Sequence, residues 1–275
     1  INVVSQASQV VGIMEHLGVQ LGLACGLAIR EQQFGTGQCV VACTGDGATS
    51  QGDFHEALNV AAVWSLPVVF IVERNYWGLS TPEEEQFKFK SFVDKGPAYG
   101  MEARSFDGNN LAECYTELTK ATDFSRTQSK PILLEANTFR IRGHEEASGT
   151  KYYPEGMIDT AMSDEPMAKI LREPDHYGMD EKSLKLEMEK AKVRVDEAFH
   201  AALALDGPSY DAEESARDLF AEVPALPESA SDSSREMRLI DALHDGLKES
   251  LALWPELIYM GQDIGPYGGV FKATE

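Results

Sequence analysis

The chain has 275 residues, 43% of them hydrophobic, and a formal net charge of −21 at pH 7. This length and hydrophobic content suffice for one large α/β domain with a buried core and a further segment. The negative charge argues against nucleic acid and acidic membrane surfaces as partners, because both are bound through lysine and arginine. The sequence also lacks an apolar run of about 20 residues, the length needed to span a membrane.

The cysteines indicate a reducing compartment. Cys25, Cys39, Cys43 and Cys114 include no CxxC pair and no metal-ligand spacing, and we interpret Cys25, Cys39 and Cys43, which lie in apolar surroundings, as small core side chains. We therefore expect a cytoplasmic, bacterial location. Residue 1 is isoleucine, so we also expect the chain to begin inside a longer protein.

The first predicted helix covers residues 14–29. Glycine recurs at every fourth position, at Gly18, Gly22 and Gly26, which gives the helix one smooth face. Each glycine costs up to about 1 kcal/mol relative to alanine inside a helix. Three in register therefore indicate that a neighbouring backbone or a ligand approaches closely.

A short apolar strand, residues 40–43, leads into the turn Gly45-Asp46-Gly47. Two glycines around a carboxylate permit a tight turn and a close approach of the backbone to a ligand. A helix is predicted to begin near Ser50, with its apolar residues on one stripe: Phe54, Ala57, Leu58, Ala61 and Ala62. The start of this helix favours an anion at the turn, although such a turn alone is also common without any function.

A second strand, residues 67–72, is followed by Asn75. Asn75 and Asp46 are therefore expected at the same edge of a parallel sheet, where α/β proteins bind ligands. An aspartate beside a bound polyphosphate requires a cation between them, and Mg²⁺ takes such oxygen ligands. Asp46, the Asn75 side chain and a nearby backbone carbonyl are the predicted ligands.

Two further strands, residues 103–106 and 131–136, flank a helix at residues 111–122. Strands that alternate with helices predict a parallel, doubly wound α/β sheet. Asp107-Gly108-Asn109 follows the third strand, and we interpret it as a strand-to-helix turn rather than a second metal site.

Basic residues and a histidine follow the last of these strands. Arg140 and Arg142 are suited to neutralising a diphosphate, and His144 is suited to proton transfer near neutral pH. A lone loop histidine is equally compatible with a solvated side chain that has no catalytic role.

The C-terminal part of the chain changes in composition. A long helix capped by Asp180 is predicted to reach about residue 205 and to pack on the sheet. Residues 207–234 have the composition of an exposed linker. A helix at residues 238–253, a strand at residues 257–260 and a glycine-rich loop then indicate a new domain. The predicted divisions are residues 1–206, 207–234 and 235–275.

Gly-Asp-Gly, 27 intervening residues and Asn75 resemble the thiamin-diphosphate-binding motif of transketolases, decarboxylases and 2-oxo acid dehydrogenases. The surrounding sequence GDGATSQGDFHEALNVAAVWSLPVVFIVERN is similar to the α part of the decarboxylating first component of 2-oxo acid dehydrogenase complexes. The resemblance implies the thiamin-diphosphate-binding fold, with Mg²⁺ held by the side chains of Asp46 and Asn75 and the backbone carbonyl of Trp77. It also implies cofactor contacts from Gly45, Gly47 and Ala48.

Two other segments resemble the same family. MEHLGVQLGLACGLA is similar to the segment whose first residues, here Glu15 and Leu17, contact the aminopyrimidine ring of the cofactor. TFRIRGH resembles a Thr-Tyr-Arg-x-x-Gly-His element. This resemblance implies that His144 faces the thiazolium, both as the catalytic residue and as a cofactor-binding residue, and that Arg140 supports the phosphate region.

The chain departs from the family pattern in three places. Gln51 stands where glutamate is usual, and Arg74 stands where many relatives have a second asparagine. Residues 145–149 replace the serine-rich loop that is phosphorylated in animal enzymes. We therefore do not expect regulation by a kinase at position 145.

The segment after the linker resembles the start of the family's β subunit, with its YGGVF signature. The resemblance implies a fused αβ enzyme whose β-type, transketolase-like domain starts within residues 235–275. The glutamate that activates the aminopyrimidine would lie beyond this stretch. We therefore expect the fragment 1–275 alone to be inactive.

The implied reaction is oxidative decarboxylation of a 2-oxo acid, with acyl transfer to the lipoyl group of a dihydrolipoyl acyltransferase. Branched-chain substrates such as 2-oxoisovalerate are preferred to pyruvate or acetoin, because Leu79-Ser80-Thr81-Pro82 is closer to that branch. The implied assembly is a homodimer of fused chains or an α2β2-like oligomer. A transketolase-like enzyme and a non-catalytic phosphate- or nucleotide-binding domain are the alternatives, since fold alone does not fix function.

Overall fold

The computed structural model describes residues 9–12, 16–145, 147, 149–207, 211–219, 236–261 and 263–274. The chain divides into two compact units, Ile1–Ala204 and Leu205–Glu275.

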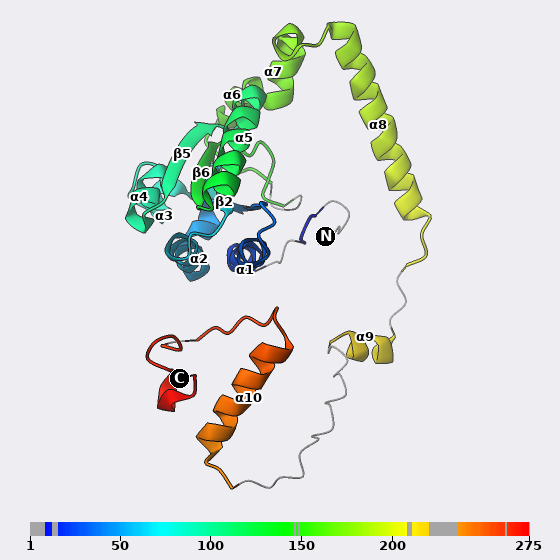
Figure 1. Cartoon of the computed structure of the whole chain (residues 1–275). Helices are drawn as coiled ribbons and strands as arrows, with labels where there is room; N and C mark the ends of the chain where they lie inside the picture. Colours follow the sequence, from blue (N-terminus) through cyan, green and yellow to red (C-terminus); the bar gives the residue numbers. More distant parts are fainter. Residues whose placement is uncertain are drawn as a thin grey trace. The chain divides into compact units, whose positions relative to one another are not determined.

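A four-stranded parallel sheet forms the centre of the first unit (Figure 1). The register pairs Gly45 with Glu73, and Asn137 with both Arg74 and Asp107, so the carboxyl ends of all four strands lie at one edge. In order across the sheet, the strands are β1 (Val40–Gly45), β2 (Val68–Arg74), β6 (Ile132–Asn137) and β5 (Glu102–Asp107).

Helices cover both faces of this sheet, which confirms the predicted doubly wound α/β arrangement. α1 (Val19–Phe34) and α2 (Gly52–Val63) pack on one face, in a core that includes Phe70. α5 (Leu111–Gln128) packs on the other face, in a core that includes Phe106. Successive residues of β2 enter the two cores in turn, because side chains alternate between the faces of a strand.

The first unit ends in α8 (Glu181–Leu203), a long helix that is exposed along most of its length. Asp180 caps it as predicted, with its carboxylate accepting a hydrogen bond from Ser183 N at 2.8 Å. The predicted packing of this helix on the sheet is wrong, because Leu184 alone is buried within it. An amphipathic pattern shows that one face is suited to burial but does not identify the surface that covers it.

The remaining elements of the first unit are short. They are η1 (Gly47–Ser50), β3 (Trp77–Gly78), β4 (Thr81–Pro82), α3 (Glu83–Gln86), η2 (Phe92–Asp94), α4 (Lys95–Tyr99), α6 (Met157–Ser163), α7 (Pro166–Arg172) and η3 (Pro174–Tyr177), followed by α8 (Glu181–Leu203). Those from η1 to α4 lie between strands in the chain, and those from α6 onward follow the last strand, β6.

Substitution of Phe70 tests the core directly. Phe70 is 1% exposed and lies in β2, the strand between β1 and β6. We expect Phe70→Ala to lower the free energy of unfolding by about 3–5 kcal/mol, through lost burial and an unfilled cavity. Urea unfolding followed by circular dichroism measures this change. Tyr115→Ala is the matched control, because Tyr115 is 74% exposed. Equal effects of the two substitutions would contradict this description of the core.

The second unit contains α9 (Ala212–Asp218), α10 (Leu239–Leu253) and η4 (Val270–Lys272). The predicted strand at residues 257–260 is wrong for this structure, since those residues have no strand conformation. A strand needs a hydrogen-bonding neighbour, and the described residues of this unit supply none. Most of the predicted linker, residues 208–210 and 220–234, lies outside the described residues.

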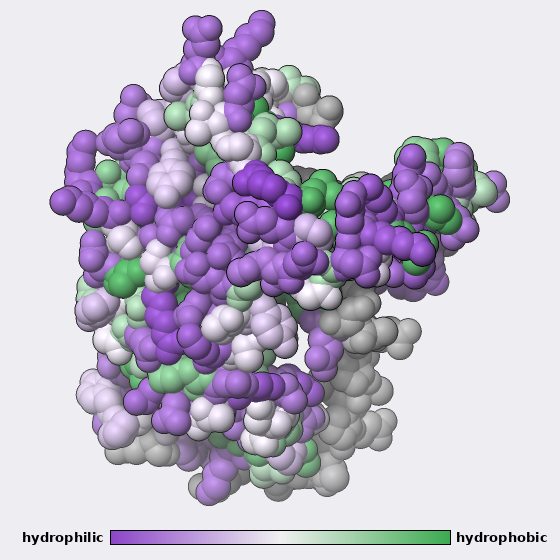
Figure 2. Space-filling model, turned by 90° about the horizontal axis from the view of Figure 1, so that it is seen from above, coloured by the Kyte–Doolittle hydropathy of each residue, from purple (hydrophilic) through white to green (hydrophobic). Residues whose placement is uncertain are grey.

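The surface agrees with the composition. Figure 2 shows a face that is mostly hydrophilic, with smaller hydrophobic areas between the hydrophilic side chains. Among the residues that the structure describes, no helix combines the length and apolar character that a membrane crossing demands.

Candidate functional site

Asp46 follows β1 directly and is buried, with 1% of its surface exposed. Its Oδ1 accepts a hydrogen bond from Gly47 N at 2.8 Å, and its Oδ2 accepts one from Asn75 N at 3.1 Å. Burial raises the pKa of this carboxyl group, because a charge is poorly solvated there. A buried carboxylate that is stabilised only by N–H groups favours a cation beside it.

Asn75 and Trp77 form the turn that faces Asp46. Asn75 Oδ1 accepts a hydrogen bond from Trp77 N at 3.1 Å, which fixes the side-chain amide against its own turn. The carbonyl oxygen of an amide has a second lone pair, so Asn75 Oδ1 can still bind a metal ion. Tyr76, between them, has a φ of 68°, the left-handed region that non-glycine residues seldom adopt.

Gly47 is positioned by a close backbone contact. A Cβ atom added to Gly47 would lie 2.9 Å from Gly78 Cα, so the β3–β4 hairpin leaves no space for a side chain there. Asp46 and Gly47 also open η1, in which Ala48 is buried. The predicted residues Gly45, Asp46, Gly47, Ala48 and Asn75 therefore lie together at the end of β1.

The two glycines of this turn give a matched pair of substitutions. We expect Gly47→Ala to lower the free energy of unfolding by about 1–3 kcal/mol, because the new methyl group overlaps the backbone of Gly78. Gly45→Ala is the control, since its Cβ would meet nothing within 4 Å. Urea unfolding in the absence of cofactor separates the two. Equal destabilisation would contradict the close contact between Gly47 and Gly78.

Arg140 and His144 lie next to one another after β6. Arg140 Nη1 is 3.3 Å from His144 Nδ1, and Arg140 Nη2 donates hydrogen bonds to Leu79 O at 2.6 Å and to Tyr152 Oη at 3.1 Å. The Nε of Arg140 is buried without a hydrogen-bond partner among the described residues. His144 itself is exposed. An unpaired guanidinium N–H in this position can donate to an anion.

Aromatic side chains connect the loop after β2, which contains Trp77, with the loop after β6, which contains Arg140. The Trp77 ring packs edge-on against Tyr153, with centroids 5.1 Å apart, and at an angle against Tyr152 at 5.7 Å. Tyr153 Oη donates a hydrogen bond to Arg140 O at 2.9 Å. The loop after β2 and the loop after β6 are thus in contact, so the structure brings Arg140 and Trp77 to one region.

The start of α1 lies at the same edge. Gln20 Nε2 donates a hydrogen bond to Cys43 O at 3.1 Å, and an added Cβ on Gly18 would lie 3.3 Å from Asp53 Cβ. Leu17, just before this helix, is 60% exposed. The other predicted residue of that segment, Glu15, lies outside the described residues.

The donor set at Asp46 fits a hard cation that shares its ligands with a phosphate. Throughout the described part of the chain, no group of three or more histidine, cysteine, aspartate or glutamate side chains could hold a metal ion. One carboxylate, one amide oxygen and one backbone carbonyl would leave half of an octahedral shell for phosphate oxygens and water. Mg²⁺ is usually bound in this way, by few protein ligands.

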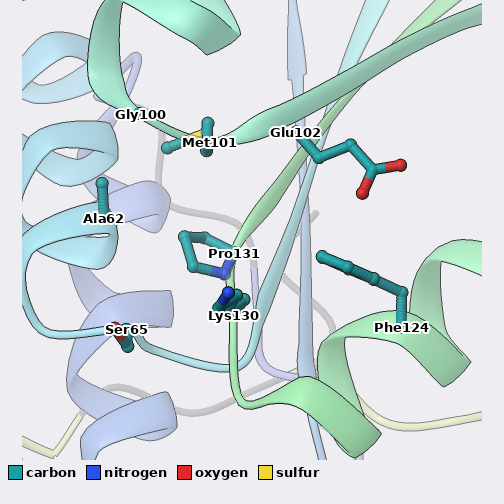
Figure 3. Close-up of a pocket in the computed structure, with 8 residues that line it drawn as sticks. All are labelled: Ala62, Ser65, Gly100, Met101, Glu102, Phe124, Lys130 and Pro131. Atoms are coloured by element: carbon teal, nitrogen blue, oxygen red, sulfur yellow. The ribbon is translucent and has the colours of Figure 1, made fainter.

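A pocket of about 320 Å³ lies at the opposite edge of the sheet (Figure 3). It is lined by apolar side chains such as Met101 and Phe124 and by the charged residues Glu102 and Lys130. Glu102 already accepts a hydrogen bond from Arg104 Nε at 2.8 Å. None of the predicted site residues lines this pocket, so the candidate site is the polar edge around Asp46.

Sequence reasoning assigned no role to three residues around this edge, Arg74, Tyr76 and Glu135. Glu135 is 2% exposed and contacts Arg74, whose pKa is raised chiefly by hydrogen bonds to Glu83. The sequence did contain one signal, because Glu135 is the single charged residue in the apolar strand that precedes Arg140.

Comparison with known proteins identifies the family. The sequence matches the family described as "Dehydrogenase E1 component" over residues 1–208. The chain belongs to the dehydrogenase E1 component family. This confirms the resemblance to the first component of 2-oxo acid dehydrogenases, and it implies thiamin diphosphate as the cofactor and the thiamin-diphosphate-binding α/β fold.

Several relatives of this E1-family chain are α subunits. It is 32% identical over 208 residues to the 3-methyl-2-oxobutanoate dehydrogenase subunit alpha of Mycobacterium tuberculosis, covering 75% of this chain and 56% of that protein. It is 40% identical to the mitochondrial 2-oxoisovalerate dehydrogenase subunit alpha 2 of Arabidopsis thaliana, covering 52% and 30%. It is 32% identical to the pyruvate dehydrogenase E1 component subunit alpha of Rickettsia bellii, covering 56% and 47%. The chain thus spans about half the length of these relatives or less.

Proposed function

We propose that the protein containing this chain catalyses the oxidative decarboxylation of a 2-oxo acid with thiamin diphosphate and Mg²⁺. The observation that carries the proposal is the buried Asp46 carboxylate, which faces Asn75 at the carboxyl edge of the sheet. Family membership supports it, because both branched-chain and pyruvate dehydrogenase α subunits are among the relatives.

Different predicted site residues bind the metal ion, the diphosphate and the aminopyrimidine ring of the cofactor. Asp46 and Asn75 hold Mg²⁺ through their side chains, and Trp77 holds it through its backbone carbonyl. Gly45, Gly47 and Ala48 approach the diphosphate with their backbone, while Arg140 offers its unpaired Nε–H to the phosphate region. Glu15 and Leu17 contact the aminopyrimidine ring.

His144 serves the reacting end of the substrate, as a group that donates or accepts a proton. When bound, thiamin diphosphate supplies a nucleophilic thiazolium carbon and takes up the electrons released as CO₂ leaves. The exposed position of His144 beside Arg140 keeps its ring accessible from the site.

The finer features of the function belong to the same proposal. A branched-chain substrate such as 2-oxoisovalerate is preferred to pyruvate, and the acyl group passes to the lipoyl group of a dihydrolipoyl acyltransferase. Residues 235–275 begin a β-type domain of the same polypeptide, which self-associates in the bacterial cytoplasm. Pocket shape controls the choice of substrate only weakly, since one methylene is worth about 1–3 kcal/mol.

The decisive experiment is a decarboxylation assay of the full-length protein with an artificial electron acceptor. 2-Oxoisovalerate and pyruvate are compared, each with and without thiamin diphosphate and Mg²⁺. We expect turnover that requires both cofactors and is faster with 2-oxoisovalerate. Folded protein that neither turns over these substrates nor binds thiamin diphosphate would instead support a non-catalytic phosphate-binding domain.

A further inference from the structure

Glu135 is the centre of a buried polar network behind the candidate site. It lies in β6, 2% exposed, and its Oε1 accepts hydrogen bonds from Arg74 Nη1 at 3.3 Å and from Ser105 Oγ at 2.9 Å. Its Oε2 accepts a hydrogen bond from Ser91 Oγ at 3.0 Å and another from Phe92 N. One carboxylate therefore joins the ends of two strands to the segment that follows the β3–β4 hairpin.

Arg74 connects this carboxylate to the first residue of α3, directly after the β3–β4 hairpin. Its Nε and Nη2 donate to the two carboxylate oxygens of Glu83 at 2.8 and 2.7 Å, a bidentate ion pair. The guanidinium group also lies over the Tyr76 ring, 4.8 Å from its centroid. An asparagine side chain at this position would be too short to span the two carboxylates.

Tyr76 completes a closed ring of contacts. Its Oη donates a hydrogen bond to Asn137 Oδ1 at 3.1 Å, and Asn137 Nδ2 donates one to Ser105 Oγ at 2.7 Å. The ring runs from Arg74 through Tyr76, Asn137 and Ser105 to Glu135 and back to Arg74. Asn75 lies between two residues that are both fixed by this ring.

We propose that Arg74, Tyr76 and Glu135 are positioning residues that preset Asn75 and the Trp77 carbonyl for Mg²⁺ and the cofactor diphosphate. This inference rests on the proposed function of the site. Two facts support positioning over simple stabilisation. A buried ion pair contributes little net stability, and Tyr76 occupies the left-handed region, which persists only where the surrounding structure holds it.

Tyr76 offers a discriminating test. Tyr76→Gly removes the ring but suits the left-handed backbone better than tyrosine does. If the backbone conformation were all that mattered, the glycine variant would bind the cofactor as well as wild type or better. We expect instead that it binds thiamin diphosphate about tenfold or more weakly at saturating Mg²⁺, as when residues behind metal ligands are lost.

Isothermal titration of the full-length protein with thiamin diphosphate, in excess Mg²⁺, measures this affinity without relying on activity. Glu135→Gln is the second variant. The glutamine amide N–H₂ cannot accept a hydrogen bond, so it must face a group that donates to Glu135 in the wild type, namely Arg74, Ser91 or Phe92. It should show the same loss of about tenfold. Circular dichroism and urea unfolding of each variant verify that the fold is kept.

The control is Arg104→Gln, which removes the ion pairs of this β5 arginine with Glu102 and with Glu117 of α5, both outside the network. Wild-type affinity in both Tyr76→Gly and Glu135→Gln would overturn the positioning role and leave the proposed function standing. The role is equally overturned if Arg104→Gln weakens binding as much. Failure of wild type itself to bind thiamin diphosphate would overturn the proposed function.

Discussion

Asp46→Ala will abolish the Mg²⁺-dependent binding of thiamin diphosphate and reduce decarboxylation by more than about 100-fold. Losing a residue behind a metal ligand typically costs about 10–100-fold in affinity, and losing a ligand itself should cost more. Asp46 supplies the only carboxylate among the proposed Mg²⁺ ligands. The backbone N–H groups of Gly47 and Asn75 that contact it cannot bind a cation in its place. Titration of thiamin diphosphate in excess Mg²⁺ and the decarboxylation assay both measure this loss.

Asp107→Ala is the matched control for this substitution. Asp107 is the last residue of β5, at the edge of the sheet where Asp46 follows β1, and like Asp46 it precedes a glycine. Its carboxylate accepts a hydrogen bond from Asn109 N at 2.8 Å and pairs with Lys169 Nζ at 3.4 Å, so its role is structural. Cofactor binding should survive in this variant. A loss equal to that of Asp46→Ala would contradict the assignment of the metal site.

The fold was predictable because its elements have strong local patterns. The continuous apolar run of β2 and the apolar stripe of α2 need no knowledge of their partners to be identified. The strand predicted at residues 257–260 failed for the opposite reason. A strand exists only where another strand pairs with it, and that depends on residues far away in the sequence.

The candidate site, like the fold, was predictable only where local spacing along the chain was sufficient. The turn around Asp46 and the position of Asn75 follow from the order of strands in a parallel sheet, so spacing along the chain was enough to bring them together. The network of Arg74 and Glu135 joins residues 61 positions apart and depends on their strands pairing side by side. In the sequence, Arg74 was only a departure from the family pattern, and the structure shows which carboxylates surround it.

His144 is the residue whose chemical role is most open to test. An arginine guanidinium can only donate hydrogen bonds, so its contact with Arg140 makes Nδ1 of His144 the acceptor. In the neutral ring the proton then resides on Nε2, the atom left to exchange a proton with the substrate. Losing a general acid or base costs about 100-fold or more.

We therefore expect His144→Gln to lower kcat for decarboxylation by about 100-fold, because glutamine fills similar space but transfers no proton at neutral pH. Affinity for thiamin diphosphate should fall far less than kcat, since His144 is not among the proposed ligands of Mg²⁺ or the diphosphate. His176→Gln, which alters an exposed histidine in η3, is the control and should keep full activity. If His144→Gln instead weakened cofactor binding and left kcat unchanged, His144 would support the cofactor through Arg140 rather than transfer a proton.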